Sequence, residues 1–542
     1  MTNKSRKIYI YLPLLFSIVL IIGILLGMKL VSFSNADNNF FSINLKKYNK
    51  INDVIYYIEN SYVDSVDKEE MMEKGIVGML ENLDPHSQYI SVEDFNEIND
   101  PLEGNFQGIG VQFRMLRDTI TVINTIPGGP SEGAGILAGD RIVMIEGDLV
   151  AGVNFPEDDV KKRLKGTKGT EVKISVYRWG EKNLLDFTIT RGIIPTYSVD
   201  ISYIVKDSIG YIKVSTFSGT SYSEFVDALE KLSDEGMQKL ILDLRGNSGG
   251  LLSEAISMAD ELLKKGELIV YTEGINRSSD YAFATKKGLF DENPLVILID
   301  ESSASASEII AGAIQDNDRG TIVGRRSYGK GLVQEQLGLI DGSAIRLTVS
   351  RYHTPTGRCI QKSYNNGIED YYREFHRRLE NGELENADSI QFIDSLKFTT
   401  PKGKIVYGGG GIMPDVYIAV KSGEMYRYFN LLVNKDLIYL FSFDYTDRHR
   451  KQLNQFKSTK DLDQNFTITA KMFDDFVKFA EDNGVQRDEE GITFSQNRIE
   501  NLIKSLIARN IFDDEGFYPI YLRSDSTFIK AVEMLSDENY VF

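Results

Sequence analysis

Three short segments of this chain contain the residue types that an acyl-transfer site needs. Residues 303–308 are Ser-Ala-Ser-Ala-Ser-Glu, residues 243–250 are Asp-Leu-Arg-Gly-Asn-Ser-Gly-Gly, and residues 327–334 are Ser-Tyr-Gly-Lys-Gly-Leu-Val-Gln. The first offers a serine nucleophile and the third offers a lysine as base. The second is a glycine turn whose backbone N–H groups can bind an oxyanion. Together they predict acyl transfer through a serine.

A serine hydroxyl is a poor nucleophile until a base removes its proton, and histidine is the usual base. None of the four histidines lies in these segments, and His86 is better explained as a capping or packing residue in a helix-ending turn. Lys330 can act as base only when it is neutral, which requires burial. Lowering its pKa from about 10.4 to about 7.5 requires the ammonium to lose about 4 kcal/mol of solvation free energy. We expect Leu332 to help exclude water and the Gln334 amide to hold the amine.

In these motifs the chain resembles the carboxyl-terminal processing proteases, also called tail-specific proteases. In that family the middle serine of Ser-Ala-Ser-Ala-Ser-Glu is the nucleophile. A lysine follows 25 residues later in Phe/Tyr-Gly-Lys-Gly-x-Val-Gln, as Lys330 follows Ser305 here. The resemblance implies that Ser305 is the nucleophile, Lys330 the general base and Gln334 the residue that orients the lysine.

The resemblance also implies an oxyanion hole. Its donors are the backbone N–H of Ala306 and an N–H of the glycine turn, from Gly249 or Gly250, and these two alternatives stay open. Taken singly, each motif has a simpler interpretation: a serine helix cap, a solvated loop lysine and a plain turn. The occurrence of all three in order, at the family's spacing, favours the catalytic interpretation.

Residues 104–193 look like a PDZ domain. Gly108, Ile109, Gly110 and Val111 fit its carboxylate-binding loop, and strands and a short helix follow in the expected order. Such a loop binds the terminal carboxylate of a peptide through successive backbone N–H groups, while the peptide adds a strand to the sheet edge. We therefore expect polypeptides with apolar C-terminal tails as substrates.

The predicted fold class is α/β and multidomain, with a crotonase-like protease core, an inserted PDZ domain, an N-terminal transmembrane helix and helical segments at both ends. After Pro195 strands and helices alternate, and the nucleophile stands where the apolar strand 295–300 gives way to a helix. The predicted segments are 1–36 (cytoplasmic tip and anchor), 37–103 (helical), 104–193 (PDZ), 194–420 (protease core) and 421–542 (helical appendage of unknown role).

The N-terminus predicts membrane attachment. Lys4, Arg6 and Lys7 precede an uncharged apolar run over residues 8–28, whose length as a helix, about 31 Å, matches the hydrocarbon core. The excess of basic residues before the run predicts a cytoplasmic N-terminus. The expectation is a single-pass protein of the plasma (inner) membrane with its catalytic part outside the cytoplasm, in the periplasm of a two-membrane bacterium. Two alternatives stay open: the anchor is cleaved off, or the apolar run forms a buried core helix and not a membrane span.

Composition narrows the function further. A net charge of −18 argues against nucleic-acid binding, and a single cysteine, Cys359, excludes an internal disulfide framework and a cysteine-type zinc site. We expect no metal and no organic cofactor. The last 120 or so residues match no known pattern; helical periodicity appears at 473–480, 499–508 and 528–535, and 461–465 is predicted to be a loop.

The predicted function is a membrane-anchored serine endopeptidase that recognises C-termini through its PDZ domain and cleaves by a Ser-Lys dyad through an acyl-enzyme. Two alternatives stay open: a catalytically silent PDZ scaffold that binds C-termini, and a crotonase-type acyl-CoA enzyme with the same oxyanion logic. An adaptor protein that delivers substrates also stays open.

Overall fold

The structure is a computed structural model that describes residues 16–23, 50–538 and 540. The chain divides into two compact units, Met1–Met79 and Leu80–Phe542. In the first, α2 (Lys50–Ser61) and α3 (Lys68–Leu80) are the two helices that the apolar periodicity predicts. The second unit contains the elements that position the site.

One part of the predicted fold has to be corrected, the transmembrane helix at residues 8–28. Residues 16–23 of this segment are helical, and the rest lies outside the described residues. Within the described residues, no helix has both the length and the apolar character needed to cross a membrane. The fold description therefore contains no transmembrane helix.

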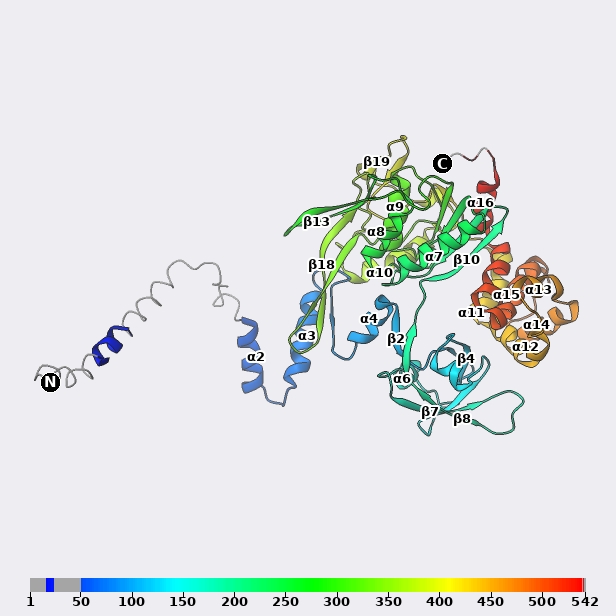
Figure 1. Ribbon diagram of the computed structural model, residues 1–542, viewed down its shortest axis with the longest axis horizontal. Helices are drawn as coiled ribbons and strands as arrows, with labels where there is room; N and C mark the ends of the chain where they lie inside the picture. Colours follow the sequence, from blue (N-terminus) through cyan, green and yellow to red (C-terminus); the bar gives the residue numbers. More distant parts are fainter. Residues whose placement is uncertain (1–15, 24–49, 539, 541–542) are drawn as a thin grey trace, which may run out of the picture. The chain divides into compact units, whose positions relative to one another are not determined.

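A six-stranded sheet forms the centre of the second unit (Figure 1). Its first pair is antiparallel and every other pair is parallel. Parallel strands are covered on both faces, which explains the unbroken apolar run Leu295–Ile299, buried at every position. In order across the sheet, the strands are β10 (Val199–Lys206), β11 (Ile209–Val214), β12 (Lys239–Asp243), β15 (Leu295–Ile299), β16 (Thr321–Gly324) and β21 (Val416–Tyr417).

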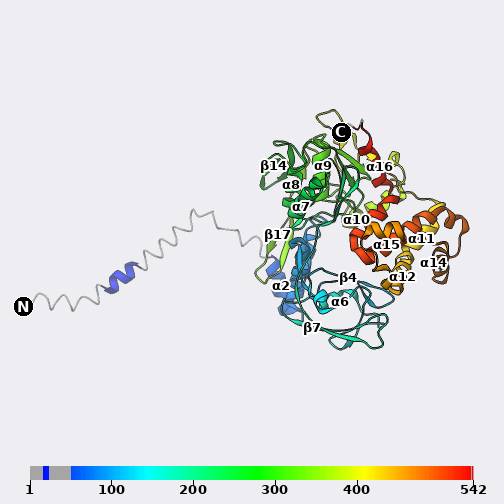
Figure 2. The same ribbon diagram turned by 45° about the vertical axis from the view of Figure 1, so that its right-hand side comes forward.

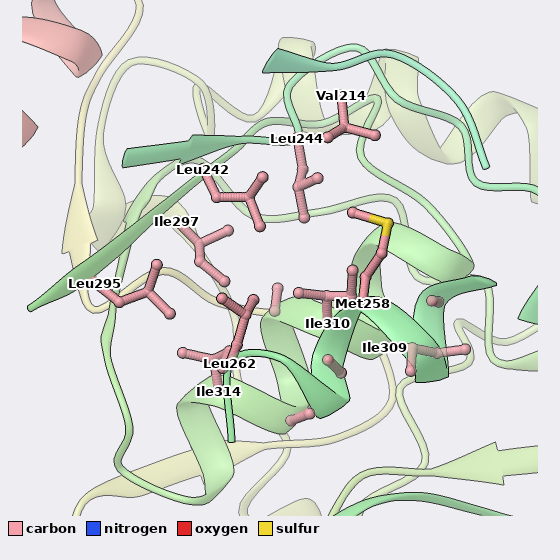
Figure 3. Close-up of a cluster of buried hydrophobic side chains, with 14 of the residues drawn as sticks. Val214, Leu242, Leu244, Met258, Leu262, Leu295, Ile297, Ile309, Ile310 and Ile314 are labelled. Carbon is pink, nitrogen blue, oxygen red and sulfur yellow. The ribbon is translucent and has the colours of Figure 1, made fainter. Parts of the chain in front are cut away.

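Helices cover both faces of this sheet. On one face, α7 (Ser221–Asp234), α8 (Leu252–Asp260) and α9 (Ala306–Asp316) bury one continuous apolar cluster, in which Ile310 and Ile314 lie against Leu242 and Ile297 (Figure 3). On the other face, α16 (Ser526–Ser536) packs with Phe528 and Leu535 against a second cluster of strand residues. The C-terminal helix is thus a layer of the domain that this sheet forms.

A second sheet carries the segment after the predicted lysine base. It contains β1 (Gln88–Ile90), β13 (Leu268–Gly274), β14 (Arg277–Phe283), β17 (Leu332–Gly338) and β18 (Ala344–His353). The long strand β18 pairs with β1, β13 and β17. The helix-ending turn before β1 is thereby brought beside the lysine loop. After β18 come α10 (Ile368–Glu380), η2 (Ala387–Ser389), η3 (Asp394–Leu396) and the ribbon β19 (Lys397–Thr399) with β20 (Ile405–Tyr407).

The predicted PDZ region folds around its own apolar cluster. Its sheet has the order β3-β4-β5-β7-β8, so β3 is an edge strand, and β2 pairs with β9 where the chain enters and leaves the domain. The elements are α4 (Phe95–Glu103), β2 (Asn105–Gly108), β3 (Val111–Met115), β4 (Ile120–Thr125), α5 (Pro130–Ala134), β5 (Arg141–Ile145), β6 (Asp148–Leu149), α6 (Glu157–Leu164), β7 (Glu171–Tyr177), β8 (Leu185–Thr190) and β9 (Gly192–Pro195).

The C-terminal helices form a bundle around a third apolar cluster, and both views show them gathered together (Figure 1 and Figure 2). The loop predicted at 461–465 is wrong: these residues belong to a helix that Ser458 caps by accepting from Asp461 N–H. The elements are η4 (Glu424–Tyr426), α11 (Arg427–Asn434), α12 (Leu437–Leu453), α13 (Thr459–Asn465), α14 (Ala470–Asp482), α15 (Glu489–Tyr521) and η5 (Leu522–Ser524), with α16 after them.

Aspartates on or next to α12 pair with arginines of the predicted PDZ region. Asp436 binds Arg114 at 2.9 Å, and Asp447 binds Arg141 at 3.0 Å. The bundle and this region are therefore in direct polar contact.

The burial of α16 can be tested with neighbouring residues of that helix. Phe528 is 6% exposed and Ile529 is 38% exposed. Phe528→Ala removes a buried ring, so we expect it to lower the free energy of unfolding by about 3–5 kcal/mol. Ile529→Ala, the matched control, should cost less than about 1 kcal/mol. Urea unfolding measures both, and equal effects would show that α16 does not complete the core.

Candidate active site

Ser305 stands at the junction between β15 and α9, as the cap residue of the helix. Its backbone has φ 52° and ψ −111°, a conformation that residues other than glycine rarely adopt. Such strain concentrates at functional sites, where it aims a side chain. The N–H of Ala306, the first residue of α9, has no hydrogen-bond acceptor in the described part of the chain. A helix N-terminus with a free N–H favours a negatively charged oxygen.

The glycine turn lies directly against this junction. A Cβ added to Gly249 would be 2.7 Å from Ser305 Cβ and 3.1 Å from Ala306 N. The two candidate donors differ: Gly249 N–H already donates to Asn247 Oδ1 at 2.8 Å, whereas Gly250 N–H has no acceptor among the described residues. In this conformation the free donor of the turn is therefore Gly250.

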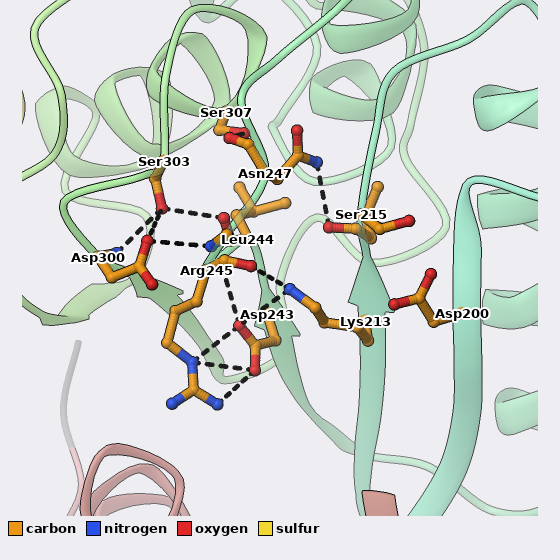
Figure 4. Close-up of polar contacts among 12 residues, drawn as sticks. Asp200, Lys213, Ser215, Asp243, Leu244, Arg245, Asn247, Asp300, Ser303 and Ser307 are labelled. Carbon is orange, nitrogen blue, oxygen red and sulfur yellow. Dashed lines mark hydrogen bonds and ion pairs between the residues drawn. The ribbon is translucent and has the colours of Figure 1, made fainter. Parts of the chain in front are cut away.

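Hydrogen bonds fix the turn to the nucleophile loop (Figure 4). The Asn247 carbonyl accepts from Ala304 N–H at 3.0 Å and from the Ser307 hydroxyl at 2.9 Å. The Ser303 hydroxyl donates to the Leu244 carbonyl at 2.9 Å. The two serines that flank Ser305 in the motif thus hold the loop in place.

The carboxylate of Glu308 joins the nucleophile loop to the lysine loop. It is fully buried and accepts hydrogen bonds from four donors. One oxygen accepts from Ser305 N–H at 2.9 Å and from Lys330 N–H at 2.9 Å. The other accepts from Gly329 N–H at 2.7 Å and from the Ser327 hydroxyl. The backbone nitrogens of the predicted nucleophile and base therefore share one oxygen atom.

A second link joins the same two residues. The Tyr352 hydroxyl lies 2.7 Å from the Lys330 carbonyl oxygen, to which it donates, and 3.2 Å from the Ser305 carbonyl oxygen. Tyr352 is buried on β18. The loops are thus tied together on two sides.

The Lys330 side chain is held where the sequence analysis places it. Its ammonium nitrogen donates to Gln334 Oε1 at 3.1 Å, and the Gln334 amide donates in turn to the His86 carbonyl. Burial lowers the pKa of Lys330 below its usual value, and the positive charge of Arg346 lowers it further. The carboxylates of Glu308 and Asp84 oppose this shift. The net direction favours the neutral amine that a general base requires.

The turn that contains His86 belongs to the site. Thr348 on β18 donates to Asp84 Oδ1 at 3.0 Å, which fixes the turn beside the lysine. His86 Nε2 lies 2.8 Å from the Tyr371 hydroxyl. Burial lowers the pKa of His86 to about 4, and Lys330 and Lys362 lower it as well. The imidazole is therefore neutral at physiological pH, and His86 contacts Gln334 through its carbonyl oxygen.

The predicted carboxylate loop of the PDZ domain lies at the start of β3. Gly110 has φ 74°, in the left-handed region, and an added Cβ would be 3.0 Å from Ile194 Cδ1. In the described part of the chain, the N–H groups of Ile109 and Gly110 have no acceptor. Gly108 and Val111 flank them, as the last residue of β2 and the first of β3. Two free N–H groups in succession suit a carboxylate.

With this geometry described, comparison with known proteins identifies the family. Residues 208–372 match peptidase family S41, and residues 107–189 match the PDZ domain. The carboxy-terminal-processing protease of Bartonella bacilliformis is 37% identical over 336 residues, which cover 61% of this chain and 75% of that protein. The chain belongs to the carboxy-terminal processing proteases of peptidase family S41. The predicted family resemblance and the serine-type peptidase class are thereby confirmed, as is the presence of a PDZ domain.

Other matches cover further parts of this S41 protease. The carboxy-terminal processing protease CtpA of Bacillus subtilis is 34% identical over 317 residues, 58% of this chain and 67% of that protein. A PDZ domain of the Vibrio cholerae carboxy-terminal protease, solved with a peptide, is 32% identical over 17% of this chain and 97% of that chain, with a TM-score of 0.16. Residues 29–94 match the N-terminal domain of the activating protease CtpB, and residues 428–513 match a family of unknown function.

Sequence reasoning missed several residues of the site. Glu308 stands three residues after Ser305, the spacing of a capping box, and this signal could have found it. Tyr352 and the His86 carbonyl reach the site through sheet pairing, which leaves no local pattern. Among the described residues, no three His, Cys, Asp or Glu side chains are grouped to hold a metal ion.

The role of Glu308 can be tested by substitution. Glu308→Ala leaves buried donors of both loops without an acceptor, so we expect the free energy of unfolding to fall by about 2–4 kcal/mol. Peptidase activity should be lost as well. Glu308→Gln is the matched control: it keeps one oxygen acceptor in the same shape and should recover part of the stability. Urea unfolding checks this, and an unchanged midpoint for Glu308→Ala would contradict the role.

Proposed function

We propose that this protein is an endopeptidase that recognises polypeptide C-termini and cleaves through an acyl-enzyme on Ser305, with Lys330 as general base. The observation that carries the proposal is the shared Glu308 oxygen, which holds the backbone of Ser305 and of Lys330 together. The S41 family match and the depressed pKa of Lys330 support it. The assignment of the dyad rests on these residues and extends the family identification.

We propose the following chemical steps. The neutral Lys330 amine accepts the proton of the Ser305 hydroxyl as its oxygen attacks the scissile carbonyl carbon. The N–H of Ala306 and the free N–H of Gly250 then stabilise the negatively charged oxygen. The Lys330 ammonium gives its proton to the leaving amine, the C–N bond breaks, and an ester on Ser305 remains. Water, deprotonated by the same amine, releases the new carboxylate and restores the serine.

Gln334 sets the direction of the lysine amine without adding a charge. Its oxygen accepts from Lys330 Nζ, while its NH₂ group is fixed by the His86 carbonyl. A carboxylate at this position would stabilise the ammonium and remove the base. The neutral amide therefore fits a lysine that must lose its proton.

The PDZ domain supports the recognition of C-termini. Its loop offers free N–H groups to a carboxylate, and the adjoining β3 is an edge strand that a peptide can extend. A related PDZ domain has been solved with a peptide. We propose that a substrate tail binds here with its terminal carboxylate in the loop and its apolar side chains against the domain.

The location outside the cytoplasm remains a prediction. Protease accessibility of the catalytic part in intact cells and in cells with a permeabilised envelope tests it. Degradation by added protease only after the plasma membrane is broken would contradict it.

One assay separates the peptidase from a silent PDZ scaffold and from an acyl-CoA enzyme. The protein and its Ser305→Ala and Lys330→Ala variants are incubated with an unfolded protein that ends in an apolar tail. We expect cleavage by the wild type and a loss of at least about 10³-fold in both variants, because each removes one member of the dyad. Cleavage by Ser305→Ala would contradict the proposal, and binding without cleavage by the wild type would indicate the scaffold.

The pH dependence tests Lys330 as the base. Its amine is active only when neutral, so kcat/KM should rise with pH through the depressed pKa of Lys330. Arg346→Gln removes a positive charge that lowers this pKa, and the rising limb should move to higher pH. Lys362→Arg is the matched control, since Lys362 pairs with Glu374 at 3.3 Å and should leave the limb in place. A flat profile, or a limb that Arg346→Gln does not move, would contradict the assignment.

Recognition of the carboxylate can be tested with paired peptides. An apolar tail peptide with a free C-terminus should bind at least about tenfold more tightly than the same peptide with a C-terminal amide, because charge-assisted hydrogen bonds are lost. Fluorescence polarisation with the Ser305→Ala variant measures both affinities. Equal affinities would exclude carboxylate capture by the loop.

A further inference from the structure

The C-terminal helix α16 approaches the oxyanion turn through the residue that caps it, Asp525. The family matches cover residues 29–94, 107–189, 208–372 and 428–513, so Asp525 lies outside all of them. No role for this residue follows from the family identification. Its contacts place it next to the catalytic turn.

Asp525 pairs with Arg245, which stands at the end of β12. Both oxygens of Asp525 accept from Arg245 Nη1, each at 2.9 Å. The other guanidinium nitrogens bind Asp243: Nη2 donates to its Oδ2 at 2.6 Å, and Nε donates to its Oδ1 at 3.0 Å. The side chains of Arg245 and Asp525 are only 16% and 17% exposed, so solvent screens this pair weakly. Arg245 is thus clamped between two carboxylates.

Two members of the clamp, Arg245 and Asp243, lie at the root of the oxyanion turn (Figure 4). Lys213 donates to the Arg245 carbonyl, and Gly246 N–H donates to Asp300 Oδ1 at 3.0 Å. The next residue is Asn247, whose carbonyl binds the nucleophile loop at Ala304 N–H and at the Ser307 hydroxyl. A displacement of Arg245 is therefore transmitted within two residues to the turn that faces Ser305.

Charge explains why a second carboxylate is needed. Lys213 lies 3.7 Å from Asp243, so this carboxylate serves two cations, Lys213 and Arg245. Asp525 supplies the second negative charge and balances the group. Without it, a largely buried cluster would hold one unpaired positive charge, which is strongly unfavourable in a desolvated position. The structure around the turn would have to rearrange to admit water.

We propose that Asp525 is a positioning residue for catalysis: through Arg245 it holds the turn at residues 245–250 in the conformation that presents its free N–H to the oxyanion. The C-terminal helix α16 then helps to position the active site through its cap residue. This inference rests on the proposed function, because it assigns the turn to the oxyanion hole. Asp525 contacts neither the substrate nor the reacting atoms.

The capping role of Asp525 has to be separated from the clamp. Asp525 Oδ1 also accepts from Phe528 N–H at 2.7 Å at the start of α16. Asparagine and serine cap helices about as well as aspartate. Asp525→Asn keeps the cap and the shape but removes the charge, and Asp525→Ser keeps the cap but is too short to bind Arg245. Both variants therefore preserve the helix start, while Asp525→Asn removes the charge of the clamp and Asp525→Ser removes the contact with Arg245.

The test is a steady-state comparison on a tailed peptide substrate. We expect Asp525→Asn and Asp525→Ser to lower kcat at least about tenfold with KM within about twofold, because a misplaced oxyanion donor affects the transition state more than the bound substrate. Asp525→Glu keeps the charge and should recover part of the loss. A peptide boronic acid, whose adduct on Ser305 places an oxygen in the oxyanion site, should inhibit both clamp variants at least about tenfold more weakly.

Asp463 provides the matched control. It lies in the same C-terminal region, its side chain is also 17% exposed, and it binds Arg523 at 2.7 Å and Lys504 at 3.0 Å. In the described part of the chain, none of its hydrogen bonds or ion pairs reaches residues 243–250. Asp463→Asn removes a comparable ion pair and should leave kcat and boronate inhibition within about twofold of wild type. An equal loss in both variants would show a general stability effect and overturn the inference.

Further outcomes are decisive. Wild-type kcat and boronate inhibition in Asp525→Asn, confirmed as folded by urea unfolding, would overturn the positioning role. If Asp525→Asn alone is too unstable to assay, it is combined with Arg245→Met: equal kcat for Arg245→Met and the double variant supports the clamp, and a further loss in the double variant overturns it. Activity in Ser305→Ala would instead remove the proposed function, so the two failures are distinguishable.

Discussion

The proposed catalytic geometry depends on one buried carboxylate. Glu308 accepts hydrogen bonds from two loops that leave different parts of the core, the nucleophile loop before α9 and the lysine loop before β17. A buried carboxylate is stable only when its lone pairs are filled, so this group and its donors require each other. Burial raises the pKa of Glu308, and the donated hydrogen bonds oppose that rise. Both loops are thereby held in one arrangement.

The same carboxylate also sets a constraint on the lysine. A negative charge near Lys330 raises its pKa, whereas the reaction needs a neutral amine. Burial and the positive charge of Arg346 lower the pKa of Lys330. The hydrogen-bond partner of the lysine nitrogen, Gln334, is uncharged and does not raise the pKa through a charge. The site thus combines a charged group, the Glu308 carboxylate, that binds the backbone with an uncharged group, the Gln334 amide, that binds the lysine side chain. Glu308 accepts from the backbone N–H of Lys330, and Gln334 accepts from its side-chain nitrogen.

Much of this site could be predicted from the sequence, because its motifs are local. Ser305, Lys330 and Gln334 lie in short patterns whose spacing is read directly, and the strands and helices around them follow from apolar runs. The contributions of His86 and Tyr352 arise from the pairing of β1 and β17 with β18, over separations that no local pattern records. Asp525 reaches Arg245 because α16 covers the second face of the sheet. The predicted transmembrane helix is corrected because, within the described residues, no helix has the length and apolar character needed to cross a membrane.

The central claim is that the Lys330 amine is held in its neutral form, so that it can act as the base for Ser305. NMR titration of the lysine side-chain nitrogens, with Lys330→Arg used to assign the signal, measures this most directly. The account predicts that the pKa of Lys330 lies well below that of the exposed lysines, and that it rises in Arg346→Gln. A Lys330 signal that titrates together with the exposed lysines would contradict the account.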